Sequence, residues 1–176
     1  MGEQSNEDLT PSQQTIVALI EKHRQAELEK RSVDETLATM VADPYIFFVA
    51  TLVGGDDQKG VRAFYTTMLR QLPEDMEWIP VSRTVGNDKI ILEAVLKFTH
   101  SVKMDWLLPG VSATAKNVEI PMVIIFNFRD GKIASERIYW DQASTLVQLG
   151  LMQPKTFPIV GSESPHKLLQ LTRKDC

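Results

Sequence analysis

The stretch NVEIPMVIIFNFRDGKIASERIYW (117–140) decides the fold of this chain. It holds two runs rich in β-branched and aromatic residues, and Asp130-Gly131 lies between them. An Asp-Gly pair between two such runs is among the strongest short-range signals for a β-hairpin. Side chains alternate between the two faces of a strand, so the first run should bury one apolar series: Val118, Ile120, Met122, Ile124 and Phe126.

The residues after this hairpin, DQASTLVQLG (141–150), predict a final helix from about Asp141 to Leu149 that ends at Gly150. Asp141 is therefore open to two interpretations. It can cap the helix, since Asp is a preferred N-cap residue. It can also be a proton-transfer group at the end of a strand.

Before the hairpin, two further strands are expected in MEWIPVSRTVG (76–86) and KIILEAVLKFTHSVKMDW (89–106). Nearer the N-terminus, helices are expected from Pro11, from Ser32 to Asp43-Pro44, and through KGVRAFYTTMLRQL (59–72) after a cap at Asp56 or Asp57. A strand at YIFFVATLV (45–53) separates the last two. Helices set apart from an antiparallel sheet predict an α+β fold, here a strongly curved sheet wrapped around helices with an internal pocket.

Length and composition predict one domain, with a polar N-terminal lead (1–11), the folded domain (12–153) and a C-terminal tail (154–176). The net charge is −4 and basic residues do not cluster, so nucleic acid is not an expected partner. Cys176 is the only cysteine, which excludes an internal disulfide framework and suits a cytoplasmic, reducing compartment. The polar N-terminus and the lack of a long apolar run predict neither a signal peptide nor a membrane span.

His100 and Asp105 are candidate catalytic residues. Alternation places His100 on one face with Leu96, Phe98 and Met104, where it is either a general acid/base or a satisfied core histidine. Asp105 is out of phase with His100 in a regular strand. A bulge near Met104 would turn it inward as the partner of His100; otherwise it is a solvated charge at a strand end.

Other residues are candidates for binding a substrate. Tyr139 shares a strand face with Asp141, and its hydroxyl can donate to a carbonyl or enolate oxygen. Trp106 with the following LLPG can form a rim or lid. Tyr45 and Phe48 can line the pocket, and Glu119 is either a pocket carboxylate or a solvent or interface residue. For each aromatic residue the alternative is ordinary packing.

No metal or cofactor is expected. The three histidines, His23, His100 and His166, are scattered, and no H-x-x-x-H or H-E-x-x-H spacing occurs. G-x-G-x-x-G and P-loop motifs are absent as well. The sequence therefore predicts a site that works without metal or cofactor.

Four stretches carry a resemblance to a known family: FTHSVKMDWLLPG (98–110), VEIPMVIIFNFRDGKI (118–133), ERIYWDQASTLVQLGLM (136–152) and FPIVG (157–161). With the element order, they resemble the SnoaL-like branch of the NTF2-like superfamily over roughly residues 12–153. A closer resemblance is to fungal secondary-metabolism proteins often labelled dienelactone hydrolase or carboxymethylenebutenolidase. The chain has no interior cysteine and no G-x-S-x-G elbow, which argues against hydrolase chemistry of that kind.

The resemblance implies an NTF2-like cone and places the acid/base role of SnoaL-type cyclases on Asp141. It implies a cofactor-independent cyclase or isomerase that acts on an activated, polyketide-type carbonyl compound in secondary metabolism through His/Asp acid–base chemistry. A small hydrophobic substrate and a homodimer formed through the outer face of the sheet are the expected partners. The alternatives are a dehydratase similar to scytalone dehydratase and a non-catalytic module that binds a hydrophobic ligand. Convergence of His100 and a carboxylate on one cavity would favour the enzyme, and a filled or wholly apolar interior would favour the binding module.

Overall fold

A six-stranded sheet forms the centre of the protein, in a computed structural model that describes residues 9–154 and 157–173. The strand order is β2-β1-β6-β5-β4-β3. The strands are β1 (Met40–Phe48), β2 (Val53–Gly55), β3 (Glu77–Val85), β4 (Lys89–Thr99), β5 (Asn117–Arg129) and β6 (Lys132–Trp140). Most of the predicted polar lead and the extreme C-terminus lie outside the described residues.

The predicted hairpin is confirmed as β5–β6, whose last paired residues are Arg129 and Lys132. Asp130 and Gly131 between them have φ values of 53° and 69°, the left-handed conformation that a tight two-residue hairpin turn requires. The sheet is nevertheless mixed, because β1 pairs with β6 in parallel, with Phe48 opposite Ile138. These two strands come from opposite halves of the chain, so no hairpin turn constrains their relative direction.

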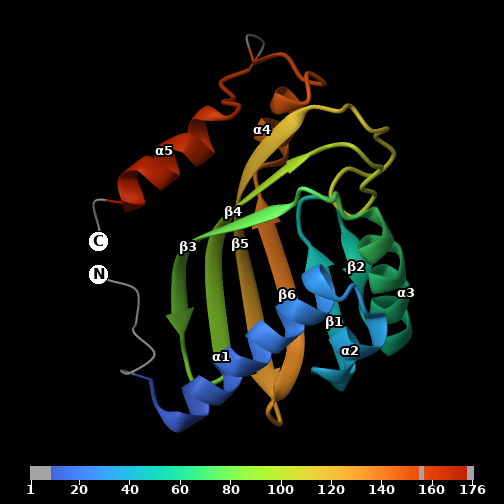
Figure 1. Ribbon diagram of the computed structural model, residues 1–176, viewed down its shortest axis with the longest axis vertical. Helices are drawn as coiled ribbons and strands as arrows, with labels where there is room; N and C mark the ends of the chain where they lie inside the picture. Colours follow the sequence, from blue (N-terminus) through green and yellow to red (C-terminus); the bar gives the residue numbers. More distant parts are fainter. Residues whose placement is uncertain (1–8, 155–156, 174–176) are drawn as a thin grey trace.

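Helices lie against this sheet in the arrangement expected for α+β, as Figure 1 shows. The first, α1 (Pro11–Arg24), crosses one face of the sheet and continues as a π-helix (Gln25–Glu29). After it come α2 (Val33–Ala38), α3 (Gln58–Met68) with a 3-10 turn (Leu69–Gln71), α4 (Gln142–Gln148) and α5 (Glu163–Thr172). The main core lies between the inner face of the sheet and helices α1 and α3.

Side-chain caps fix the helix starts where the sequence predicts them. Thr10 and Gln13 form a capping box at the start of α1, whose first residue is Pro11. At the start of α3, Asp57 accepts a hydrogen bond from the Gly60 N–H. Ser32 caps α2 by accepting from the Glu35 N–H.

Two predicted boundaries are wrong. The second helix ends at Ala38 rather than at Asp43-Pro44, and β1 runs through Pro44, where its register with β6 shifts. Such an irregularity tolerates a proline, which cannot donate to the ladder. The predicted strand 45–53 is also divided, because β1 ends at Phe48 and β2 begins at Val53.

The predicted long strand 89–106 ends at Thr99, and residues 100–116 form an irregular segment. Met104, Trp106, Leu107 and Leu108 within it are at most 5% exposed, so this segment closes one end of the cone. Three of these residues are consecutive, and an alternating strand could not bury all of them on one face.

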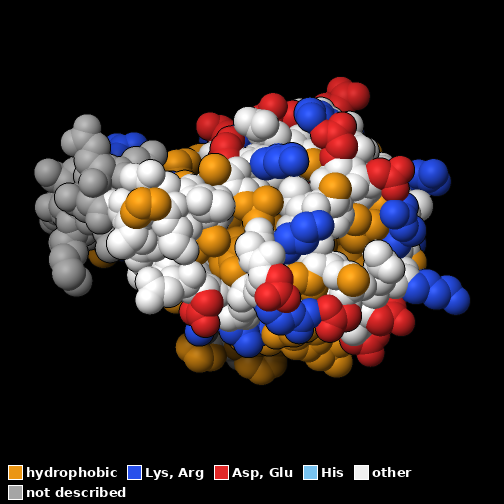
Figure 2. Space-filling model, turned by 90° about the horizontal axis from the view of Figure 1, so that it is seen from below, with side chains coloured by type: hydrophobic (Ala, Val, Ile, Leu, Met, Phe, Trp, Pro, Cys, Tyr) orange, Lys and Arg blue, Asp and Glu red, His pale blue; other side chains and the backbone are white. Residues whose placement is uncertain are grey.

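The surface is mixed in charge where Figure 2 shows it, at the end of the molecule that carries the β5–β6 turn. Basic, acidic and hydrophobic side chains are interspersed there and do not gather by sign. Within the described residues, no helix has both the length and the apolar character needed to cross a bilayer.

Candidate active site

A cavity lies between α1 and the inner face of the sheet. Its volume is about 100 Å³, counted as the space that the centre of a water-sized sphere can reach. Its walls are mostly apolar, and four aromatic side chains contribute to them: Phe48, Trp78, Trp106 and Phe126. Such a lining suits a small hydrophobic ligand held by a few polar groups.

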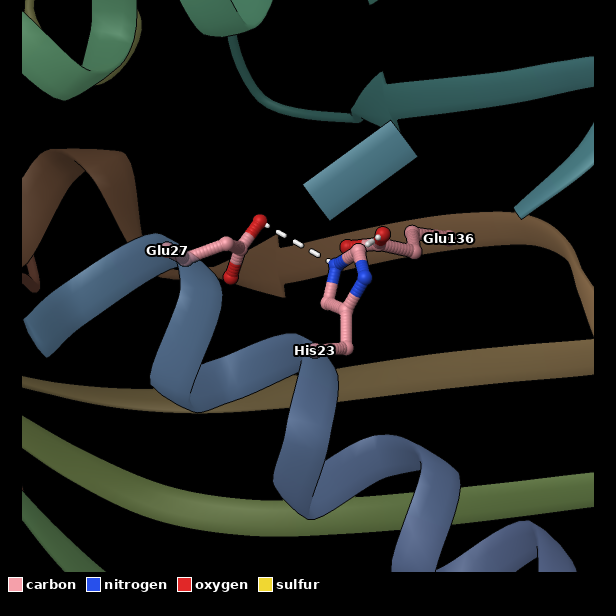
Figure 3. A group of neighbouring side chains, drawn as sticks. All are labelled: His23, Glu27 and Glu136. Atoms are coloured by element: carbon pink, nitrogen blue, oxygen red, sulfur yellow. Dashed lines mark ion pairs between the residues drawn. The ribbon is translucent and has the colours of Figure 1, made fainter. Parts of the chain in front are cut away.

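Three ionisable side chains converge on this cavity: His23 from α1, Glu27 from the π-helix and Glu136 from β6 (Figure 3). The Nε2 atom of His23 lies 2.9 Å from Oε1 of Glu136 and 3.2 Å from Oε1 of Glu27. One imidazole nitrogen therefore faces two carboxylates at the edge of an apolar space.

Local structure explains this convergence. His23 follows Ile16 and Ile20 on the buried side of α1, and Glu27 follows His23 by one turn. At this point the helix widens into the π-form, with the Lys30 N–H donating to the Gln25 carbonyl at 3.0 Å. π-Turns of this kind occur frequently at functional sites. Glu136 lies on the inner face of β6, two positions before the buried Ile138.

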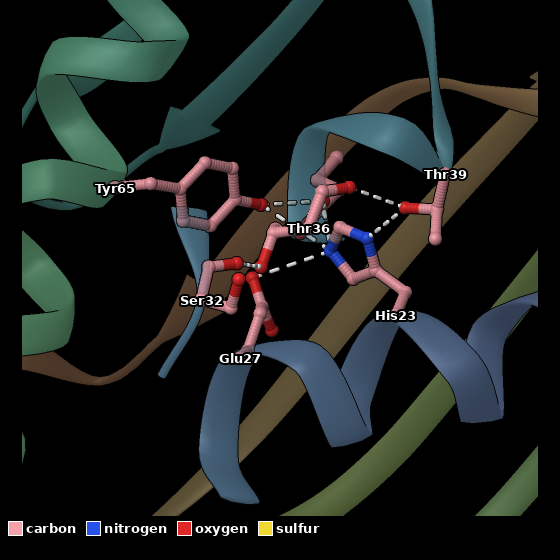
Figure 4. Close-up of polar contacts among 7 residues, drawn as sticks. His23, Glu27, Ser32, Thr36, Thr39 and Tyr65 are labelled. Carbon is pink, nitrogen blue, oxygen red and sulfur yellow. Dashed lines mark hydrogen bonds and ion pairs between the residues drawn. The ribbon is translucent and has the colours of Figure 1, made fainter. Parts of the chain in front are cut away.

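Neutral groups complete the contacts around His23, as Figure 4 shows. The Tyr65 hydroxyl from α3 donates to Oε1 of Glu136 at 2.8 Å and lies 3.3 Å from His23 Nε2. On the other side of the ring, His23 Nδ1 lies 2.6 Å from Oγ1 of Thr39. His23, Tyr65 and Thr39 are at most 1% exposed and Glu136 is 4% exposed, so their polar atoms depend on one another for hydrogen bonds.

The charges around His23 favour its protonated form. Burial alone would lower the pKa of His23, but the carboxylates of Glu27 and Glu136 outweigh it and raise the pKa to about 10. Burial raises the pKa of Glu136, against the opposing effect of His23. Burial and the Glu136 charge raise the pKa of Tyr65 well above its usual value. Near neutral pH the His23 ring is therefore the cation of the cluster.

A second hollow of about 520 Å³, by the same measure, lies between α1 and strands β3 and β4. It shares Ile20, Arg24, Trp78 and Leu92 with the inner cavity, so the two spaces adjoin. The Arg24 side chain at this junction is partly exposed and pairs with Glu21 at 2.6 Å.

Two predicted lining residues do lie on the cavity. Phe48 and Trp106 both line it, and their rings contact each other edge to face at 5.7 Å between centroids. Trp106 belongs to the segment that closes the cone, and its role as a rim or lid residue stays a prediction.

His100 and Asp105 are not among the residues that line this cavity, so the expected convergence of this pair is not observed. The strand ends at Thr99, so alternation no longer determines where His100 points. His100 is fully buried beside Thr114, with Nδ1 3.1 Å from Oγ1, and burial lowers its pKa. Asp105 is paired with Lys103 and accepts from Gln71, which fastens the segment to the 3-10 turn after α3.

The remaining predicted residues also lie outside the cavity lining. Asp141 is exposed and caps α4 by accepting from the Ser144 N–H at 3.1 Å. Tyr139 and Tyr45 point away from the cavity and are 41% and 37% exposed. Glu119 pairs with Lys97 and His166 on the outer face of the sheet.

The histidine and carboxylates that do converge were not among the predicted site residues. A usable signal exists in the sequence, because His23 continues the apolar series of α1, and Glu136 occupies an inward position of an alternating strand. A polar residue on an otherwise apolar face is costly unless it has a partner. Two such residues on different elements are therefore candidates to meet.

The same three residues are also where the described part of the chain could hold a metal ion. One ligand atom from each of His23, Glu27 and Glu136 lies within 4.8 Å of the others. A cation there would have to displace the proton on His23 Nε2, because a nitrogen ligand must be deprotonated.

The fold and the site define an NTF2-like α+β cone that encloses an apolar cavity with a buried His–Glu cluster on its wall. The family model of the SnoaL-like polyketide cyclases matches residues 21–149, and the chain belongs to this family. Membership implies a small-molecule substrate. These comparisons do not support the finer resemblance to fungal proteins labelled dienelactone hydrolase.

Solved structures support the fold. A protein from Jannaschia sp. CCS1 described as a SnoaL-like polyketide cyclase has a TM-score of 0.65 and 19% identity over 83% of this chain and 99% of that one. IdmH from Streptomyces antibioticus, described as a polyketide cyclase, has a TM-score of 0.56 and 21% identity over 80% and 99%. An NTF2-like protein from Burkholderia pseudomallei K96243 has a TM-score of 0.59 and 13% identity over 77% and 97%. Among curated proteins, no significant match was found.

Proposed function

We propose that this protein is a cofactor-independent cyclase or isomerase that moves protons on an activated, polyketide-type carbonyl compound. The observation that carries the proposal is the placement of His23 Nε2 between two carboxylates on the wall of an apolar cavity. Carbonyl compounds of this type have acidified C–H bonds, so a positioned base and a positioned acid are sufficient equipment.

Glu27 is the proposed base. Its side chain is the more exposed of the two, at 15% against 5% for the side chain of Glu136, and it lines the cavity. Glu136 instead accepts hydrogen bonds from both His23 and Tyr65, which suits a fixed counter-charge. Glu136 would thus keep His23 protonated while Glu27 accepts a proton from the substrate.

The proposed reaction begins when Glu27 removes a proton from the carbon next to the carbonyl and His23 donates its Nε2 proton to the oxygen. Isomerisation follows when the carbon skeleton is reprotonated at another position. Cyclisation follows when the enol carbon attacks a second carbonyl, whose oxygen takes the proton from Glu27. In isomerisation the Glu27 proton goes to the carbon skeleton instead. In both reactions the enol O–H gives its proton back to His23 Nε2 as the first carbonyl re-forms, so the site ends as it began.

Dehydration needs the same groups, because a general acid can protonate a leaving hydroxyl after the same proton removal. The binding-module alternative is less well supported. A pure binding cavity gains nothing from buried charges, which cost free energy unless they are well paired. A ligand that binds without proton transfer would nevertheless favour that alternative.

Proton transfer can be measured before the natural substrate is known. The test uses 2-tetralone, a neutral bicyclic ketone, and follows deuterium incorporation next to its carbonyl in D₂O by NMR. Binding is measured separately from the fluorescence of Trp78 and Trp106, which line the cavity. His23→Gln and Glu27→Gln are the test variants. His166→Gln, an exposed histidine in α5, is the matched control.

We expect the wild-type protein and the His166→Gln variant to accelerate the exchange equally. Loss of either His23 or Glu27 should slow it by roughly 10²- to 10⁴-fold, the usual contribution of a general acid or base. Binding accompanied by an exchange rate that does not depend on His23 and Glu27 would instead identify a binding module.

A further inference from the structure

We infer that Thr39 is a positioning residue that keeps a proton on Nδ1 of His23, so that acid–base chemistry passes through Nε2 alone. This inference rests on the proposed function for its consequence in catalysis. Its structural content, the identity of the protonated ring nitrogen, does not depend on activity.

The hydrogens available to the Thr39 hydroxyl determine which atom donates in each of its two hydrogen bonds. The Thr39 hydroxyl donates its single hydrogen to the Thr36 carbonyl at 2.6 Å. The same oxygen lies 2.6 Å from His23 Nδ1, and with its hydrogen already used it can only accept there. Nδ1 must therefore carry a hydrogen, whether the ring is neutral or charged.

The fold holds this acceptor in place. Thr39 is the C-cap of α2. Its backbone N–H donates to the same Thr36 carbonyl at 3.1 Å, and its own carbonyl accepts from the Ile133 N–H of β6 at 3.1 Å. The side chain is 1% exposed, so water cannot replace it. The acceptor is thus held by hydrogen bonds to both α2 and β6.

All the ionisable groups in contact with His23 lie on the opposite side of the ring. Glu27 of the π-helix, Tyr65 of α3 and Glu136 of β6 face Nε2, whereas α2 contributes only the neutral Thr39, at Nδ1 (Figure 4). With Nδ1–H fixed, neutral His23 has its lone pair on Nε2, beside the carboxylates. The ring can then donate and recover the Nε2 proton without rearrangement.

The experiment measures ring protonation directly. Protein labelled with ¹⁵N-histidine is studied by long-range ¹H–¹⁵N correlation NMR across the pH range, and the His23 signals are assigned by their loss in His23→Gln. We expect the wild-type Nδ1 shift to stay that of a protonated nitrogen while any titration appears at Nε2. A wild-type spectrum with an unprotonated Nδ1 overturns the inference, and the only variant this result needs is His23→Gln, for the assignment.

Two variants test whether Thr39 is the residue that keeps the proton on Nδ1 of His23. Thr39→Val removes the acceptor, which disfavours the doubly protonated ring, so the His23 pKa and the basic limb of the 2-tetralone exchange profile should both move to lower pH. The rate should fall about 10- to 100-fold, as when a partner that orients a functional histidine is lost. Thr39→Ser should restore the wild-type profile.

Thr36→Val is the matched control, since Thr36 is equally buried and its hydroxyl donates to the Ser32 carbonyl rather than to the ring. It should leave the Nδ1 shift and the pH profile unchanged. Exchange that requires His23 but does not respond to Thr39→Val overturns the positioning role and leaves the proposed function intact. Exchange that does not require His23 overturns the proposed function, and the NMR result then still decides the tautomer.

Discussion

Nε2 of His23 and Oε1 of Glu136 meet at 2.9 Å, one carried by the first helix and the other by the last strand of the sheet. Both side chains are almost fully buried, so water does not screen their interaction. A buried pair of this kind contributes little compared with apolar packing while it is intact. Its loss is costly because one charge stays buried without its partner.

Glu136→Ala should therefore destabilise the protein by about 3 kcal/mol, near the lower end for a broken buried pair, because Glu27 still faces His23. Glu136→Gln should cost less, since an amide oxygen can still accept from the Tyr65 hydroxyl. Urea unfolding followed by circular dichroism gives both values.

Glu119→Gln is the control, because Glu119 also pairs with a histidine, His166, at 3.0 Å, but on the outer face of the sheet. Exposed pairs contribute about 0–1 kcal/mol, so this variant should be nearly neutral. Equal losses for Glu136→Ala and Glu119→Gln would mean that burial does not distinguish the two pairs.

Stability should fall as the pH rises from 6.5 to about 10. The folded state raises the His23 pKa from 6.5 to about 10, so it binds this proton more tightly than the unfolded chain does. The resulting stabilisation is fully present below pH 6.5 and is lost as the pH approaches about 10. Burial also raises the pKa of Glu136, which gives the same sign of pH dependence in a window that begins at 4.5.

The free energy of unfolding across this range provides the measurement, with wild type compared against His23→Gln and His166→Gln. His166 is exposed, so His166→Gln should retain the wild-type slope. His23→Gln should flatten it. A slope that is the same in all three proteins would locate the pH dependence elsewhere.

The sequence predicted the fold well where local signals and the final structure agree. The Asp130-Gly131 turn, the caps at Thr10-Pro11 and Asp57, and the stop at Gly150 are all set by neighbouring residues. The parallel pairing of β1 with β6 joins distant segments and has no local signature. The end of β4 at Thr99 was missed because Met104 and Trp106 continue its apolar pattern, whereas the structure buries them in the irregular segment that closes the cone.

The site was predicted less well for a related reason. His100 was a candidate because it lay on the apolar face of a predicted strand, and Asp141 because it ended one. Both match a family pattern, but the structure gives them local partners, Thr114 and Ser144. His23 and Glu136 lie far apart in the sequence, and only the packing of α1 across β6 brings them together. Membership of the family was therefore easier to predict than the residues of the site.

Removal of metal ions should leave activity unchanged. A divalent cation at His23, Glu27 and Glu136 would compete with a proton held at a pKa of about 10, so cation binding is opposed near neutral pH. Protein dialysed against EDTA should keep its 2-tetralone exchange rate, and added Zn²⁺ should not raise the melting temperature. Loss of exchange with EDTA and its recovery with one particular metal would contradict this.

We expect a homodimer formed through the outer face of the sheet. Tyr139 of β6 and Tyr45 of β1 are exposed on this side. Nε of Arg137, two residues before Tyr139 on β6, has no hydrogen-bond partner among the described residues. Light scattering should give a dimer mass for wild type and a monomer mass for Tyr139→Glu. Leu52→Glu, at a 79% exposed position in the β1–β2 turn, is the control. A wild-type monomer at micromolar concentration would contradict the dimer.

The family resemblance and the structure predict different roles for Asp141. The resemblance assigns it the acid/base role, whereas the structure places its carboxylate on the Ser144 N–H at the start of α4, outside the cavity lining. Asn caps a helix about as well as Asp but does not titrate. We therefore expect Asp141→Asn to keep both its stability and its exchange rate, and Asp141→Ala to lose about 0.5–2 kcal/mol of stability, as for a lost cap. A stable Asp141→Asn protein whose exchange rate falls by orders of magnitude would return the catalytic role to Asp141 and reduce His23, Glu27 and Glu136 to a structural cluster.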